Sequence, residues 1–134
     1  MCLKTLTKEK KIDPLEPEIW YKLVDKYKTK KGKVYYTSYC RSKKIELNTV
    51  YQDKSKGFIT ASHFRSAFEK YQKGYHFYNI TGARKGIRKY CGNNYYYGTT
   101  VILKCLVWNI VCHGKDYYGR ACVARKFVAL GEVK

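Results

Sequence analysis

Apolar and polar residues alternate along the first half of the chain, with a break at a lysine-rich turn. Glu18–Tyr27 (EIWYKLVDKY) alternates with a period of two and predicts a strand. Val34–Cys40 (VYYTSYC) predicts a second strand, since β-branched and aromatic residues dominate it. The TKKGK segment between them predicts a hairpin loop, because Gly32 can take a positive φ and the lysines keep the tip in water. Ile45–Gln52 predicts a third, edge-like segment.

The pattern changes to a helical period in the middle of the chain. Thr60–Lys73 predicts a helix that ends at Gly74, because its aromatic residues recur at spacings of three and four. The stretch GYHFYNI, which begins at Gly74, predicts the next strand. Thr81 then predicts the N-cap of a short second helix, ARKGIRKY, that Gly86 weakens.

The last third of the chain predicts two further strands. Thr99–Val111 is apolar at both odd and even positions, which indicates a central strand with both faces buried. CHGKDYYGR predicts a hairpin connection, and Ala121–Leu130 predicts the closing strand. The prolines of DPLEP suit an extended segment, so residues 1–17 are expected to form a flexible N-terminal arm. We therefore expect one α+β domain over residues 18–134, a mostly antiparallel sheet with one or two helices packed on one face.

Charge narrows the possible functions. The chain has 28 Lys and Arg against 10 Asp and Glu, a net charge of +18, while 45% hydrophobic residues indicate a folded domain. Such a charge attracts polyanions, so nucleic acid or an acidic protein surface is the expected partner. A lysine-rich surface without a specific partner is the alternative interpretation of the same composition.

The candidate binding residues are basic side chains in three groups. They lie at the predicted hairpin tip, in the RSKK segment that follows the second strand, and in the TGARKGIRK segment behind the GYHFYNI strand. The last group suits phosphate, because helix N-terminal N–H groups and guanidinium groups bind anions, although a solvated helix face would have the same sequence. The full set is Lys30, Lys31, Lys33, Arg41, Lys43, Lys44, Arg84, Lys85, Arg88 and Lys89.

The motifs of common catalytic and metal sites are missing from the sequence. It has neither G-x-S-x-G nor HExxH nor a C-x-x-C pair, so we expect no catalytic residues, no metal and no cofactor. The six cysteines are interpreted as reduced and as small apolar residues of strands. A polar, basic start without an apolar signal region and the lack of a membrane-length apolar run indicate a cytoplasmic protein.

Short motifs are spread over most of the chain: the opening MCL, then IWYKLV, the GYHFY strand followed by Ala83, TVILKCLV, the YYG loop and the closing ACVARKFVALGE. Together they resemble a family of small proteins from gut bacteria, their phages and other mobile elements. Tyr75 replaces the phenylalanine that is usual in that family. The resemblance implies a phage or mobile-element accessory protein.

A fainter likeness is to ADP-ribosyltransferases. GYHFYNITGARKGIRKY is similar to their glycine-aromatic strand and the helix that follows it. This resemblance implies NAD chemistry, for which His76 and the late Glu132 are the visible candidates.

Charge, missing catalytic motifs and the family resemblance together favour a protein that works by binding. The leading hypothesis is an accessory inhibitor, such as an anti-CRISPR protein, acting in the host cytoplasm. It would engage a host defence effector, its guide RNA or both through the basic residues named above, without contact with a membrane. The alternatives are an ADP-ribosyltransferase-like enzyme and a structural protein of the virion.

Overall fold

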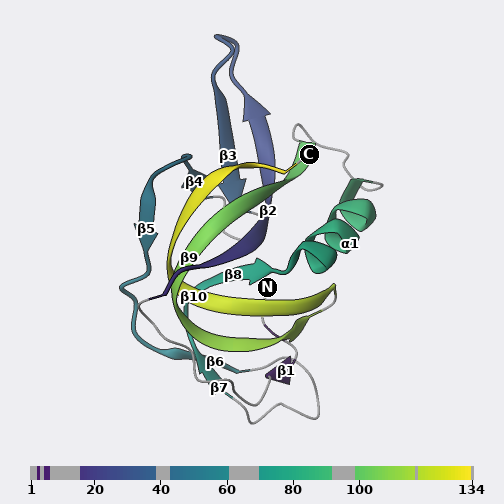
Figure 1. Cartoon of the computed structure of the whole chain (residues 1–134). Coiled ribbons are helices and arrows are strands. Elements are labelled where there is room, and N and C mark those ends of the chain that lie inside the picture. The colour runs from purple at the N-terminus through teal and green to yellow at the C-terminus, as the bar shows by residue number, and fades with distance from the viewer. Residues whose placement is uncertain are drawn as a thin grey trace.

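A computed structural model of the chain describes residue 3 and residues 5–6, 16–38, 43–60, 70–91, 99–116 and 118–133. Ten strands and one helix lie in these ranges (Figure 1). The strands are β1 (Thr5–Leu6), β2 (Glu18–Lys28), β3 (Val34–Ser38), β4 (Lys44–Ile45), β5 (Val50–Gln52), β6 (Phe58–Thr60), β7 (Lys70–Gln72), β8 (Tyr75–Tyr78), β9 (Thr99–Asp116) and β10 (Gly119–Glu132). The helix is α1 (Ile80–Cys91). The expected antiparallel sheet is therefore confirmed, and the described part of the molecule is mainly β.

Four strands of the large sheet are paired in a closed circuit. β2 pairs with β9, β9 with β10, β10 with β8, and β8 returns to β2 at Tyr21 and Tyr78. We call these four strands the closed sheet. β3 and β4 extend it beyond β2, β5 pairs with the second half of β10, and β1 pairs with the end of β9. Every one of these pairings is antiparallel.

β9 bends as it passes from β2 to β10. Residues 99–107 pair with β2 and residues 103–116 with β10, so residues 103–107 lie between both neighbours. The register of the β9–β10 pair shifts between Val123 and Ala124. Asn109 takes a positive φ of 54° beside this shift, a conformation that asparagine tolerates better than most residues. The bulge increases the local bend of β9.

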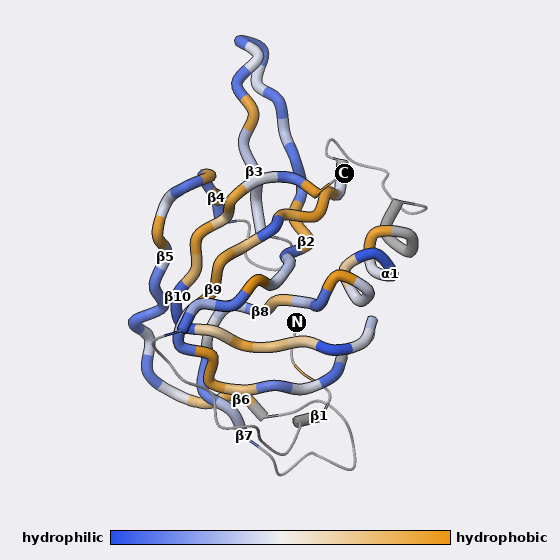
Figure 2. Tube along the Cα trace, viewed as in Figure 1, coloured by the Kyte–Doolittle hydropathy of each residue, from blue (hydrophilic) through white to orange (hydrophobic). Residues whose placement is uncertain are grey.

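Both faces of the closed sheet are buried. Val24, Phe77, Leu103 and Cys122 belong to the larger apolar cluster, and the residue next to each one along its strand belongs to the smaller cluster. Alternate side chains of a strand point to opposite faces, so the two clusters lie on the two sides of the sheet. α1 contributes Ala83 to the smaller cluster. Figure 2 shows hydrophobic stretches along β9 and β10.

The helix predicted at Thr60–Lys73 is wrong at both ends. Thr60 ends β6, which pairs with β7 by Thr60 and Lys70, while residues 61–69 lie outside the described part of the chain. Tyr71 is buried at 3% exposure, and its hydroxyl oxygen accepts a 2.8 Å hydrogen bond from the Leu3 backbone N–H. Tyr71, one of the side chains that suggested a helical face, is therefore a buried residue of the short strand β7.

Two boundary predictions around this region are also corrected. Gly74 does not end a helix: it is buried between β7 and β8, and a Cβ there would lie 2.7 Å from the Ala124 carbonyl oxygen. The N-cap of α1 is Asn79 rather than Thr81, because the Asn79 side-chain oxygen accepts a 2.8 Å hydrogen bond from the Gly82 N–H. The asparagine that follows the aromatic strand offers that acceptor two residues earlier.

The last connection is shorter than the sequence suggested. Residues predicted as a hairpin loop instead continue β9 as far as Asp116, and β10 begins at Gly119 with a positive φ of 130°.

Residues 1–17 were expected to form a flexible N-terminal segment. Within them, Leu3 is 1% exposed and β1 pairs with β9. In the described residues, no helix has the length and apolar character that a membrane crossing requires.

An internal arginine holds the segment between β5 and β6 against β10. Arg125 is 8% exposed and donates to the Ser55 carbonyl at 2.6 Å and to the Lys73 carbonyl at 2.5 Å. Its guanidinium also lies 3.8 Å from the Asp53 carboxylate. This cation is therefore a structural one and does not contribute to a basic binding surface.

Candidate functional site

The β2–β3 hairpin projects beyond the closed sheet. β2 pairs with β9 as far as Lys26, and β3 pairs with β4 only from Tyr36 onward. Between these points, residues 27–35 pair within the described structure only with each other. We call residues 27–35 the arm. Figure 1 shows it standing above the rest of the molecule, and its tip is hydrophilic in Figure 2.

The tip of the arm is a defined turn. The Thr29 N–H donates to the Lys33 carbonyl and the Gly32 N–H to the Thr29 carbonyl, both at 2.8 Å. The Thr29 hydroxyl oxygen accepts a further hydrogen bond from the Lys33 N–H at 3.0 Å. Gly32 has a φ of 84°, as the last loop residue of a three-residue hairpin loop requires. The predicted hairpin loop is thereby confirmed, with Lys30 and Lys31 at its apex.

Four lysines make the arm strongly cationic. Lys28, Lys30, Lys31 and Lys33 are all exposed, and the arm has no acidic residue. None of the four forms an ion pair with the described residues. Each ammonium group is therefore hydrated and available to an anionic partner.

Two tyrosines stiffen the arm below its tip. Tyr27 and Tyr35 are directly opposite in the β2–β3 register, and their rings stack with centroids 5.3 Å apart at an interplanar angle of 17°. The Lys44 ammonium lies 5.5 Å from the Tyr35 ring centroid. Cross-strand aromatic pairs of this kind add to the stability of a hairpin.

A carboxylate fixes the base of the arm to the last strand. One Glu132 oxygen accepts hydrogen bonds from the Lys26 ammonium and the Tyr36 hydroxyl, both at 2.8 Å. The bond from Lys26, with a further one from Tyr36, lowers the pKa of Glu132 below its ordinary value of 4.5. Burial, together with the nearby Glu132 carboxylate, raises the pKa of Tyr36 to about 12. The two groups therefore remain an ionised acceptor and a neutral donor at pH 7.

The structure separates the predicted binding residues into groups. Lys30, Lys31 and Lys33 are at the tip of the arm, and Lys43 and Lys44 are exposed beside its base. Arg84 and Lys85 are exposed on α1, which lies to one side of the closed sheet and away from the arm in Figure 1. Arg41 lies outside the described residues. Arg88 and Lys89 lie in α1, but their side chains are outside the described part of the structure. The arm and the helix are thus two separate basic regions.

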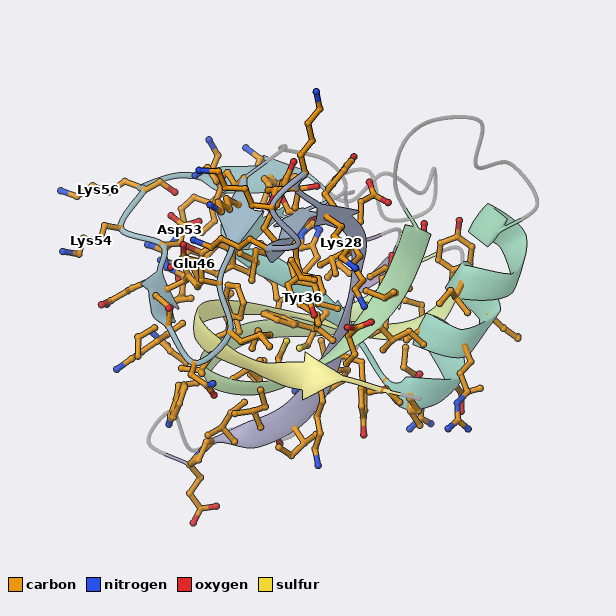
Figure 3. All side chains as sticks on the ribbon, turned by 90° about the horizontal axis from the view of Figure 1, so that it is seen from above. Lys28, Tyr36, Glu46, Asp53, Lys54 and Lys56 are labelled. Atoms are coloured by element: carbon orange, nitrogen blue, oxygen red, sulfur yellow. The ribbon has the colours of Figure 1, made fainter. Side chains whose placement is uncertain are left out.

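Sequence reasoning missed several residues of these basic regions. Tyr27 was assigned to the strand alone and Lys28 to no element, although a turn centred on Lys31 places Tyr27 opposite Tyr35. Lys54 and Lys56 were also missed, and both are exposed and point outward from the segment after β5 (Figure 3). A count of charges in predicted loops would have found this last pair.

Two of the described cysteines have the character of core residues. Cys105 and Cys122 are free thiols, and both are fully buried. Burial raises the pKa of Cys105 to about 12 and that of Cys122 well above its ordinary value. Among the described residues, no group of three or more His, Cys, Asp or Glu side chains is arranged to hold a metal ion.

Glu132 and His76, the two candidate residues for NAD chemistry, both contact other parts of the fold. Glu132 is engaged by Lys26 and Tyr36 at the base of the arm. His76 lies on β8, where its ring packs 6.2 Å from the Tyr71 ring and its carbonyl accepts a 3.0 Å hydrogen bond from Lys22. Glu132 is thus held by side-chain hydrogen bonds, and the His76 ring packs beside Tyr71.

One shallow hollow lies where β2 begins beside the start of α1. It has a volume of about 480 Å³ and is lined by Glu18, Ile19, Trp20, Tyr21, Asn79 and Ile80. Its charged lining residue, Glu18, accepts a 3.0 Å hydrogen bond from the Trp20 indole. A carboxylate at this position disfavours an anionic ligand, so the hollow does not extend the basic surface.

Comparisons of the chain with models of protein families, with curated proteins and with solved structures found no match. The residues of the arm and their surroundings are therefore the basis for a functional proposal.

Proposed function

We propose that this protein acts by binding nucleic acid through its arm, and not as an enzyme. The observation that carries the proposal is the set of four exposed lysines on a projecting hairpin that contains no acidic residue. Lysine ammonium groups bind phosphates as point charges, and the release of condensed counterions drives such association.

The acidic groups closest to the arm leave its charge available. Glu132 is already bound by Lys26 at the base. Asp25 precedes the arm on β2 and accepts a 3.3 Å hydrogen bond from the Thr100 hydroxyl. Glu46 is exposed and lies 3.9 Å from Lys44, which belongs to β4 and not to the arm. Because none of them pairs with an arm lysine, a partner phosphate does not have to displace an internal ion pair.

The family resemblance suggests the setting in which this binding would occur. An accessory inhibitor of a host defence system, such as an anti-CRISPR protein, could use the arm to engage the nucleic acid of a defence effector, including a guide RNA. This biological role is part of the proposal and rests on the resemblance, whereas the binding mode rests on the arm.

The test is a salt titration of nucleic-acid affinity with a matched pair of variants. Each phosphate contact contributes about −0.9 to the slope of log K against log salt on duplex DNA. The variant Lys30→Ser/Lys31→Ser should make that negative slope shallower by about 2 and weaken binding at low salt. Fluorescence anisotropy with a labelled 20-base-pair duplex, between about 50 and 200 mM NaCl, covers the range in which such contacts are lost.

The variant Arg84→Ser/Lys85→Ser removes the same charge from α1 and serves as the control. We expect its slope to stay close to that of the unmodified protein, because these side chains lie on the separate helical region. Equal losses in both variants would show that net charge alone controls binding, and a salt-independent affinity would contradict the proposal.

A further inference from the structure

We propose that the arm enters the major groove of duplex DNA. This inference rests on the proposed nucleic-acid function and specifies the form of the partner. It is carried by three properties of the arm: its dimensions, the occupied faces of its tyrosine rings, and its rigid attachment to the closed sheet.

The dimensions of the arm fit that groove. Paired strands lie about 4.7–4.9 Å apart, and the major groove of B-form DNA, about 12 Å wide, admits a two-stranded ribbon. From Tyr27 to the apex at Lys31 the ribbon is about 13 Å long at the usual rise per residue. The groove is about 8.5 Å deep, so the tip can reach its floor while the closed sheet stays outside. The deep, narrow major groove of A-form RNA does not admit side chains in this way.

Tyr35 does not offer an open platform to single-stranded bases. Such platforms need open aromatic faces on which successive bases stack. One face of the Tyr35 ring is stacked on Tyr27, and the Lys44 ammonium also lies over this ring. The tyrosine pair therefore serves to hold the ribbon together.

Lysines on the arm and beside its base are placed to contact both walls of a groove. Lys28 is opposite Val34, and Tyr27 is opposite Tyr35, so Lys28 points to the face away from the tyrosine stack. Lys44 lies over that stack on the other face. Lys30, Lys31 and Lys33 extend the positive charge around the tip. A ribbon with cations on both faces and at its end suits the space between two rows of phosphates.

Hydrogen bonds brace the arm at its tip and at its base. The turn has two backbone hydrogen bonds and one from the Thr29 side chain, and the base is fixed by Glu132 through Lys26 and Tyr36. A preformed ribbon loses less conformational entropy on binding than a flexible loop. The structure thus favours insertion of a rigid element over folding around a single strand.

Two measurements test this inference on the full chain. The first compares affinities for a B-form duplex, its separate strands and an RNA duplex of the same sequence at equal salt. We expect the DNA duplex to bind at least about tenfold more tightly than either alternative. The second probes guanine N7, which is exposed in the major groove, by methylation with dimethyl sulfate. The bound protein should protect N7, and Lys30→Ser/Lys31→Ser should lose this protection while Arg84→Ser/Lys85→Ser retains it.

The outcomes separate this inference from the proposed function. Equal or tighter binding of single strands or RNA, or bound DNA with unprotected N7 groups, would overturn the groove inference and leave nucleic-acid binding intact. A failure to bind any of these nucleic acids at low salt would overturn both. Circular dichroism and thermal melting of each variant establish that a lost signal does not come from unfolding.

Discussion

Glu132 shows how a single carboxylate can connect a projecting element to the core. It lies near the end of β10, yet both of its described partners belong to the β2–β3 hairpin. Its side chain is 30% exposed, and that of Lys26 is 36% exposed. A pair with this exposure is worth a few tenths to about 1 kcal/mol, so its main effect is on the orientation of the arm.

The lowered pKa of Glu132 predicts a pH-dependent contribution to stability. Because the native carboxylate holds its proton less tightly than the unfolded one, its contribution is present above a pH of about 4.5 and is lost as the pH falls through the lower native pKa. The difference in unfolding free energy between the unmodified protein and Glu132→Gln should therefore shrink below pH 4.5. Urea unfolding from pH 7 to pH 3 measures this difference.

A second carboxylate of the same region provides the control. Glu46 lies 3.9 Å from Lys44, and its side chain is 58% exposed. Glu46→Gln is expected to change stability little at any pH in this range. If the effect of Glu132→Gln stays constant down to pH 3, or if Glu46→Gln has the same profile, the assigned role of Glu132 is wrong.

At the scale of elements, the two glycines at Gly74 and Gly131 predict opposite results. A Cβ at Gly74 would lie 2.7 Å from the Ala124 carbonyl oxygen and 2.8 Å from Val123 Cγ1, where the strands are closely packed. Gly74→Ala should therefore lower the unfolding free energy by about 1–3 kcal/mol, as overpacking of a core does. A Cβ at Gly131 meets no atom within 4 Å, so Gly131→Ala should be neutral or slightly stabilising.

Urea unfolding curves for the two variants give the comparison directly. The same chemical change is made twice, so a shared effect on the unfolded chain cancels between them. Equal stability of the two variants would show that the close approach of β10 to Gly74 relaxes without cost.

Local patterns predicted those elements whose partners are near in sequence. The hairpin of β2 and β3 followed from alternation and from Gly32, and the apolar run of β9 indicated a strand buried on both faces. β6 and β7 were missed because three-residue strands leave too short a pattern to outweigh a helical spacing. The closure of the sheet through Tyr21 and Tyr78 depends on a pairing between distant segments that no local pattern contains.

The candidate site was predictable to the same extent. The lysines of the hairpin tip were identified because a turn exposes its residues whatever the rest of the fold does. The Tyr27–Tyr35 stack required the exact register of the hairpin, and the role of Glu132 required the position of β10 beside it. The separation of Arg84 and Lys85 from the arm required the whole fold.

At the scale of the whole molecule, the charge imbalance predicts that salt affects folding and binding in opposite directions. Even if all 10 acidic residues were paired, 18 of the 28 basic ones would remain without a carboxylate. Their mutual repulsion opposes the compact state, and the Debye length falls from about 30 Å at 0.01 M salt to about 8 Å at 0.15 M. The midpoint of urea unfolding should therefore rise with NaCl over this range, while nucleic-acid affinity falls. Lys30→Ser/Lys31→Ser should show a smaller gain in stability, since it removes part of the repulsion. A midpoint that falls with salt would instead mean that attractive ion pairs dominate the surface, and the predicted repulsion between the basic residues would be wrong.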